Sequence, residues 1–221
     1  MRTMVAAWRR NLSGAKLHRR ATQHRALRVV SGDSVRAAVG PYDATPMTLI
    51  GDGRFSCADV TQWMIDAIGC RSLTISAWSV GLSEAAWLGT LALASDVHVI
   101  VDRSWPTRHA EFCRALVAAV GAQRVRVARC HAKMICIEGA DGHLVAVRSS
   151  ANFNPNPRIE QWDIDPDAGL YAMMRQTLMD ASLPLGASTP QVDAAFGATF
   201  GCADGLESAD LFDLTTGPRF E

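Results

Sequence analysis

From residue 46 onward, hydrophobic positions follow two alternating patterns: short runs rich in β-branched residues and longer stretches with helical spacing. The short runs predict strands and the longer stretches predict helices. Up to Gly121 the expected strands are residues 47–50, 73–80 and 97–101, and the expected helices are residues 57–68, 83–94 and 108–120. Strands that alternate with helices predict an α/β fold in which helices cover a β-sheet.

Residues at the ends of these stretches support the assignment. Ser56 precedes the first helix and Ser83 opens the second, and serine commonly caps helix N-termini. Gly69 and Gly121 follow the first and third helices, where glycine commonly ends a helix.

After Gly121 the pattern changes to strands without helices between them. Three runs follow closely, at residues 125–127, 132–137 and 144–147, and Gly139-Ala140-Asp141-Gly142 separates the last two. This indicates a β-hairpin, and pairing of residue 139 with residue 142 places Ser150 opposite His131. A strand at 161–164 and a helix at 168–181 complete a mixed β-sheet flanked by helices.

Charge divides the chain into three parts. Residues 1–45 hold nine Lys or Arg against two Asp or Glu, residues 46–150 hold ten against nine, and residues 151–221 hold three against eleven. We therefore expect a basic N-terminal arm (1–45), a compact domain (46–182) and an acidic, irregular C-terminal extension (183–221). The basic arm favours a polyanionic partner such as nucleic acid, although pairing with the acidic end, a mobile tail or an organelle-targeting segment is also consistent with it.

Composition narrows the class of protein. The chain has 221 residues, of which 48% are hydrophobic and 20% charged, as in an ordinary globular protein. It contains neither an apolar run of the roughly 18 to 20 residues that a membrane span needs nor a secretory signal, so we expect a cytoplasmic protein without membrane insertion. Its six cysteines form no C-x-x-C pair, which favours buried free thiols over a disulfide framework or a zinc site.

Four polar residues of the hairpin carry candidate chemistry. His131 and Lys133 share one face of a strand because side chains alternate, and Ser150 and Asn152 share a face of the next strand. An ammonium, a hydroxyl and a carboxamide suit the oxygens of a phosphate, and histidine is able to act as nucleophile or proton carrier. The pattern predicts a phosphoryl-transfer site.

These residues stand in the order of a known signature: His-x-Lys-x4-Asp followed by Gly-Ser-x-Asn and a later Glu. The corresponding segments here are His131-Ala132-Lys133-Met134-Ile135-Cys136-Ile137-Glu138, Ser149-Ser150-Ala151-Asn152 and Glu160. The chain thus resembles the phospholipase D superfamily over residues 46–182, including its fold, and is similar to the small single-motif bacterial endonucleases of that family.

The resemblance implies a role for each residue. His131 attacks phosphorus to give a phosphohistidine, Lys133 and Asn152 hold phosphate oxygens, Ser150 supports that pocket, and Glu160 orients the imidazole through a hydrogen bond. The mechanism needs two histidines and no metal or other cofactor. Because the chain has one motif, it implies a homodimer that shares one site.

Two positions depart from the family pattern. Glu138 replaces Asp, which bears on a structural ion pair, and Ser149 replaces Gly, which bears on a backbone position that tolerates a Cβ only if its φ is negative. The other histidines and three of the tryptophans are not assigned to the site. His98 has no assigned role, and His109 and His143 lack comparable polar neighbours. Trp63, Trp78 and Trp87 are expected in the core rather than as stacking platforms. The loop Asn154-Pro155-Asn156-Pro157 is expected at the rim of the site.

The leading hypothesis is a metal-independent phosphodiesterase, specifically a nuclease, that acts as a homodimer. A hydrolase or transphosphatidylase of phospholipids or small phosphodiesters is the second hypothesis. A catalytically inactive phospholipase D-like module that binds DNA is the third.

Overall fold

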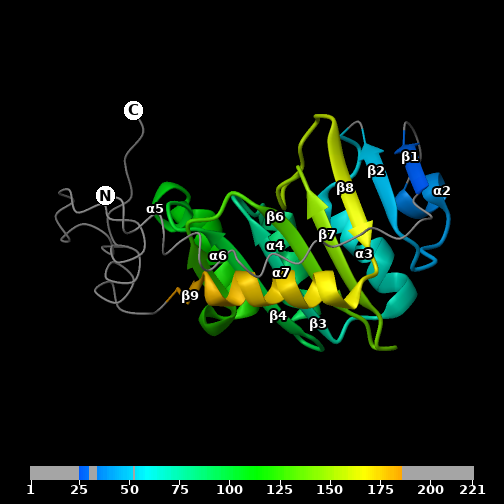
Figure 1. Cartoon of the computed structure of the whole chain (residues 1–221). Coiled ribbons are helices and arrows are strands. Elements are labelled where there is room, and N and C mark those ends of the chain that lie inside the picture. The colour runs from blue at the N-terminus through cyan, green and yellow to red at the C-terminus, as the bar shows by residue number, and fades with distance from the viewer. Residues whose placement is uncertain (1–24, 30–33, 52, 186–221) are drawn as a thin grey trace, which may run out of the picture.

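A computed structural model describes residues 25–29, 34–51 and 53–185 of the chain. Within these residues the protein is an α/β structure built on a nine-stranded mixed sheet in the order β1-β2-β8-β7-β6-β3-β4-β5-β9 (Figure 1). The strands are β1 Arg25–Val29, β2 Met47–Gly51, β3 Ser72–Ala77, β4 Asp96–Asp102, β5 Val125–Ala128, β6 Lys133–Glu138, β7 Leu144–Ser149, β8 Glu160–Asp165 and β9 Leu183–Pro184.

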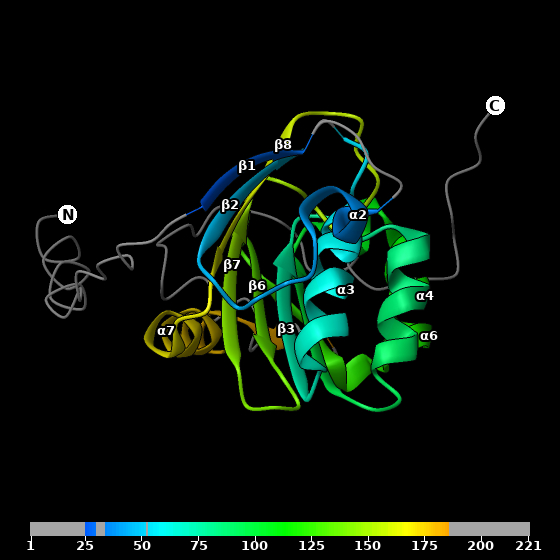
Figure 2. The same ribbon diagram turned by 90° about the vertical axis from the view of Figure 1, so that its right-hand side faces the viewer.

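Helices cover both faces of the sheet. In Figure 2, α3, α4 and α6 lie on one side and α7 lies on the other. The helices are α2 Val35–Val39, α3 Cys57–Ile68, α4 Leu82–Leu91, α5 Trp105–Arg108, α6 Ala110–Val120 and α7 Ala168–Asp180, with a 3₁₀ turn η1 at Ala122–Arg124. The largest hydrophobic cluster fills the α3, α4 and α6 side, because alternate residues such as Leu73, Ile75 and Ala77 of β3 point there.

Connection length decides strand direction. The strands β3, β4 and β5 are parallel, with helices in the connections between them, whereas β6, β7 and β8 follow one another antiparallel. Parallel neighbours need a long crossover and antiparallel neighbours need only a turn. The rhythm of the sequence, helices before Gly121 and none between the next strands, is reproduced in the sheet.

The elements expected from the hydrophobic pattern are confirmed, apart from the ends of some of them, and the strand expected at 73–80 ends at Ala77. Ser56 caps α3 with a reciprocal bond to Asp59, and Gly69 ends that helix. Ser83 was the wrong choice of cap for α4: Gly81 occupies that position, and the Ser83 hydroxyl donates to Glu84 instead. The helix expected at 108–120 begins at Ala110, after the separate turn α5.

The sheet extends beyond the range 46–182 expected for the compact domain. At one edge β1 pairs in parallel with β2, and at the other β9 pairs with β5. The segment 25–29 of the expected basic arm and residues 183 and 184 of the expected acidic extension therefore belong to the sheet. The rest of those two segments, apart from residues 34–45 and Leu185, lies outside the described residues.

The β6–β7 hairpin differs from the expected register by one residue. Lys133 pairs with Ser149, and this register, extended by two residues, places Ala151 rather than Ser150 opposite His131. The cause is the turn: Gly139 donates its N–H to the His143 carbonyl, so the loop holds three residues, and Gly142 has a φ of 89°. A three-residue loop with glycine in the left-handed region is a common hairpin form, and it shifts the pairing relative to the two-residue loop that the sequence analysis assumed.

Candidate functional site

Strand direction gathers the candidate residues at one edge of the sheet. Because β6 runs antiparallel to both β3 and β7, and β8 runs antiparallel to β7, the carboxyl ends of β3 and β7 meet the amino ends of β6 and β8. Lys133 begins β6, Glu160 begins β8, and Ser150 and Asn152 directly follow β7. The structure thus places the residues from the two separate motif segments at the same edge.

The first contact at this edge joins Lys133 to His131. The ammonium nitrogen of Lys133 lies 3.2 Å from Nδ1 and 3.1 Å from Nε2 of the imidazole, and it donates to the His131 carbonyl oxygen at 2.9 Å. An ammonium has only donors, so a ring nitrogen that it contacts must offer its lone pair. His131 is exposed and Lys133 is half-buried, which leaves the imidazole open to a ligand.

Partial burial changes the pKa of the Lys133 ammonium. Partial desolvation lowers the pKa of Lys133 from its ordinary value, while electrostatic interactions with Cys130 and Glu160 act in the opposite direction. A lysine with a lowered pKa loses its proton at a lower pH than a solvated lysine.

The second cluster is centred on Glu160, which is only 7% exposed. One carboxylate oxygen accepts a hydrogen bond from the Ser150 hydroxyl, and the other accepts one from Asn156 Nδ2 at 2.6 Å. The Ser150 hydroxyl also accepts from the backbone N–H of Gln161 at 3.0 Å. Glu160 thus ties the end of β7 to the loop that precedes β8.

The resemblance implies that Glu160 accepts a hydrogen bond from His131. In the described part of the chain, Glu160 accepts hydrogen bonds from Ser150 and Asn156, and no hydrogen bond joins it to His131. In this structure Glu160 acts on Lys133 through its charge and on Ser150 and Asn156 through contact.

A hydrogen bond from the residue that follows β3 holds the side chain of Asn152. Its side-chain oxygen accepts the backbone N–H of Trp78 at 3.1 Å, so the carboxamide NH₂ of Asn152 is turned away from that contact. Trp78 directly follows the end of β3, the strand next to β6. The amide donors of Asn152 are the groups suited to hold an anionic oxygen.

The two departures from the family pattern have local explanations. Ser149 does not have a positive φ, so a Cβ is tolerated there; its hydroxyl donates to the Gln161 carbonyl and accepts from the Ala151 N–H, both at 2.9 Å. Glu138 forms an ion pair with Arg71 at 3.0 Å, at the end of β6 opposite Lys133. Neither departure lies on His131 or Lys133.

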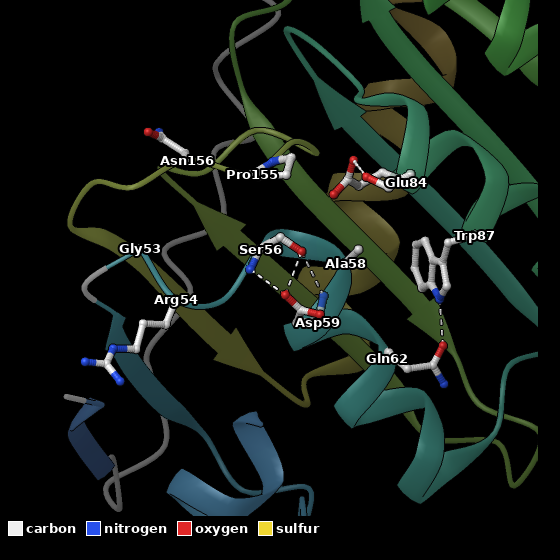
Figure 3. A pocket seen from close by; sticks show the side chains of 11 residues that line it. Gly53, Arg54, Ser56, Ala58, Asp59, Gln62, Glu84, Trp87, Pro155 and Asn156 are labelled. Atoms are coloured by element: carbon white, nitrogen blue, oxygen red, sulfur yellow. Dashed lines mark hydrogen bonds between the residues drawn. The ribbon is translucent and has the colours of Figure 1, made fainter. Parts of the chain in front are cut away.

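A pocket of about 400 Å³ lies beside the site, between the N-termini of α3 and α4 and the loop at residues 155 and 156. Figure 3 shows that several of its polar groups form hydrogen bonds with one another. The Asp59 carboxylate accepts from the backbone N–H and the hydroxyl of Ser56, and the Trp87 indole donates to Gln62 at 2.7 Å. These bonds satisfy the N-terminus of α3 and the indole of Trp87, so contacts within the protein account for part of the polar lining. Asn156 links this pocket to Glu160.

Sequence reasoning did not assign Asn156 and Trp78 to the site. Asn156 lies in the loop Asn154-Pro155-Asn156-Pro157, which was expected at the rim, and its position four residues before Glu160 was the available signal. Trp78 contributes through its backbone N–H, which no residue pattern reveals. Trp63 is buried as expected, whereas Trp78 and Trp87 are only half-buried.

Of the remaining histidines, His98 and His143 lie away from this cluster. His143 is exposed in the hairpin turn, 2.8 Å from Asp141, and His98 on β4 lies 3.3 Å from Asp96. The five described cysteines are free, and Cys57, Cys113 and Cys136 are buried. Among the described residues no group of three or more His, Cys, Asp or Glu has the arrangement of a metal site, and none of their helices combines the length and apolar character of a membrane span.

No family model matches the chain, and no curated protein is similar to it.

Proposed function

We propose that this protein is a metal-independent phosphodiesterase with a phospholipase D-like fold, and that its substrate is a nucleic acid. The observation that carries the proposal is the contact between the Lys133 ammonium and the exposed His131 imidazole, at the same sheet edge as Ser150, Asn152 and Glu160. A nucleophilic nitrogen beside a fixed cation and amide donors is what displacement at a phosphodiester requires. The order of the motif residues and the mixed sheet support the family assignment.

In the proposed reaction, a ring nitrogen of His131 attacks phosphorus, a P–N bond forms, and the bond from phosphorus to the leaving oxygen breaks. The leaving alkoxide takes a proton from a second histidine. That histidine then removes a proton from water, whose oxygen attacks phosphorus, breaks the P–N bond and restores the first imidazole.

Lys133 and the Asn152 carboxamide bind the non-bridging oxygens, where negative charge grows in the transition state. Ser150 and Glu160 act as positioning residues, because their contacts hold the end of β7 and the loop before β8 together. Glu160 also supports the cationic form of Lys133 electrostatically.

The second histidine in this proposal is His131 of a second copy of the chain. A two-fold axis at the sheet edge brings two identical His131 side chains to one phosphate, since an isologous interface presents the same surface twice. His131 is exposed, which such an arrangement requires.

The test is hydrolysis of single-stranded DNA, RNA and a chromogenic phosphodiester in the presence of EDTA. We expect activity in the wild type and a loss of about 10³-fold or more in His131→Ala, because the nucleophile is removed. His143→Ala is the matched control, since His143 is an exposed histidine in the turn at the opposite end of the hairpin.

Equal activity of His131→Ala and the wild type contradicts the proposal. So does a wild type that cleaves none of the substrates in EDTA. DNA binding that persists in a wild type without hydrolysis supports a catalytically inactive binding module instead.

A second candidate is hydrolysis of phospholipid diesters at a lipid surface. Two exposed apolar side chains favour it: Ile159, which immediately precedes Glu160 and is 78% exposed, and Leu82, at the start of α4, which is 48% exposed. Faster release of the headgroup from phospholipid vesicles than cleavage of oligonucleotides supports this candidate over the nuclease.

A further inference from the structure

Three aromatic rings form a continuous array next to the candidate site. The Trp78 and His109 rings are 6.0 Å apart at 81°, and the His109 and Phe112 rings are 6.2 Å apart at 90°. Both pairs are edge-to-face contacts, which hold the rings in fixed orientations. Trp78 and His109 are half-buried and Phe112 is 36% exposed, so each ring is partly covered by protein and partly open to solvent.

The order of the sheet places this array beside the phosphate-binding residues. The strands of the site follow in the order β8, β7, β6 and β3, and neighbouring strands lie about 4.8 Å apart. Trp78 directly follows β3, next to the strand that Lys133 begins. The backbone N–H of Trp78 also donates to Asn152, so one residue belongs to both the aromatic array and the hydrogen bonds of the site.

Three arginines lie in the chain segments that carry His109 and His131. Arg103 and Arg108 lie in the connection from β4 to α6, which also carries His109, and Arg129 lies two residues before His131. All three side chains are exposed. Two hydrogen bonds join these segments: the Arg103 N–H donates to the Ala128 carbonyl, and the Cys130 N–H donates to the Asp102 carboxylate.

Aromatic rings with arginines beside a phosphate site match the chemistry of single-stranded nucleic acid. Each unpaired base has a flat face that stacks on an aromatic ring, and the backbone supplies one negative charge per nucleotide for arginine. Bases in a duplex are stacked on one another and leave no face for these rings. Phospholipid tails have no comparable flat groups.

We propose that Trp78, His109 and Phe112 form a base-stacking subsite, and that the ligand of this protein is single-stranded nucleic acid whose bases contact these rings while a neighbouring phosphate lies at His131 and Lys133. This inference rests on the proposed phosphodiesterase function for the position of that phosphate. The stacking itself is measured without catalysis.

The experiment measures binding of the full chain to a fluorescent oligothymidylate and to an abasic oligonucleotide of equal length, which keeps the phosphates and lacks the bases. We expect the wild type to bind the oligothymidylate about tenfold more tightly than the abasic strand, because stacking of a single base contributes a change of this order. Phe112→Ala removes an exposed ring from a helix without introducing a poor helix former, and we expect it to abolish most of this preference.

Met173→Ala is the matched control, because Met173 is an exposed apolar side chain on α7, 52% exposed and on the opposite face of the sheet. It is expected to keep the wild-type preference. Trp78→Leu gives a second test of the array, since its backbone N–H remains available to Asn152.

Equal binding of the two strands by the wild type overturns the stacking proposal, as does an equal loss of affinity for both strands in Phe112→Ala. Binding to vesicles of phosphatidylglycerol and phosphatidylcholine that depends on Phe112 and exceeds oligonucleotide binding overturns it in favour of a lipid surface. A base preference without hydrolysis in EDTA supports the subsite and contradicts the phosphodiesterase proposal. Hydrolysis without a base preference supports the phosphodiesterase proposal and contradicts the stacking subsite.

Discussion

At the residue scale, the charge of Glu160 acts on the Lys133 ammonium, although no hydrogen bond or ion pair joins the two side chains in the described part of the chain. Glu160 contacts Ser150 and Asn156, while its negative charge raises the pKa of Lys133 against the lowering effect of burial. Removing that charge leaves the desolvation of Lys133 less compensated. The pKa of Lys133 then falls further.

The variant Glu160→Gln tests this coupling. Lys133 must be protonated to hold a phosphate, so activity falls as pH rises through its pKa, and a lower pKa moves that alkaline limb to lower pH. We expect the limb of the kcat/KM profile to shift in this direction in Glu160→Gln, whereas Gln161→Glu, which adds a carboxylate at the adjacent exposed position, should not lower it. An alkaline limb that stays in place in Glu160→Gln contradicts the coupling.

At the element scale, the β6–β7 hairpin sets which residues meet. Its three-residue loop depends on Gly142, whose φ of 89° lies in the left-handed region. A Cβ at Gly142 meets no atom within 4 Å, so a substitution there tests backbone conformation without a steric clash.

We expect Gly142→Ala to lower the free energy of unfolding by about 1 to 2 kcal/mol, because an L-residue is strained in this region. Urea denaturation measures the change. Gly169→Ala is the matched control: Gly169 lies in α7 without a positive φ, and a Cβ there lies 3.3 Å from Asp167 Oδ1, so alanine is expected to cost less than at Gly142. A Gly142→Ala protein as stable as the wild type contradicts this description of the turn.

At the scale of the whole molecule, the proposed chemistry requires two copies of the chain. One chain supplies one His131, and the reaction needs both a nucleophile and a proton donor. The exposed edge that carries His131, Leu82 and Ile159 is the surface available for a second copy.

Mixing subunits tests the shared site. When wild-type chains exchange with a ninefold excess of His131→Ala chains, activity per wild-type chain is expected to fall about tenfold, because most wild-type chains are then paired with a copy that lacks the histidine. Hydrolysis rates after mixing and light scattering for the oligomeric state provide the measurement. Unchanged activity per wild-type chain, or an active protein that remains monomeric, contradicts the shared site.

The sequence by itself determined most elements between residues 46 and 182 and their order, because periodicity of hydrophobic residues and the chemistry of helix ends are local properties. The helix at Cys57–Ile68, with its Ser56 cap and Gly69 end, was expected to the residue. The α/β class followed from the alternation before Gly121, and the motif residues were brought to one sheet edge as the pairing of adjacent strands implied.

Only the tertiary structure decided the contacts among those residues. The turn conformation of Gly142 shifted the hairpin by one residue, and the buried Glu160 accepts hydrogen bonds from Ser150 and Asn156. The membership of β1 and β9 in the sheet and the proximity of Trp78, His109 and Phe112 also arise from pairing and packing across large sequence separations. Such contacts depend on which surfaces meet after folding, and a local pattern contains no information on that choice.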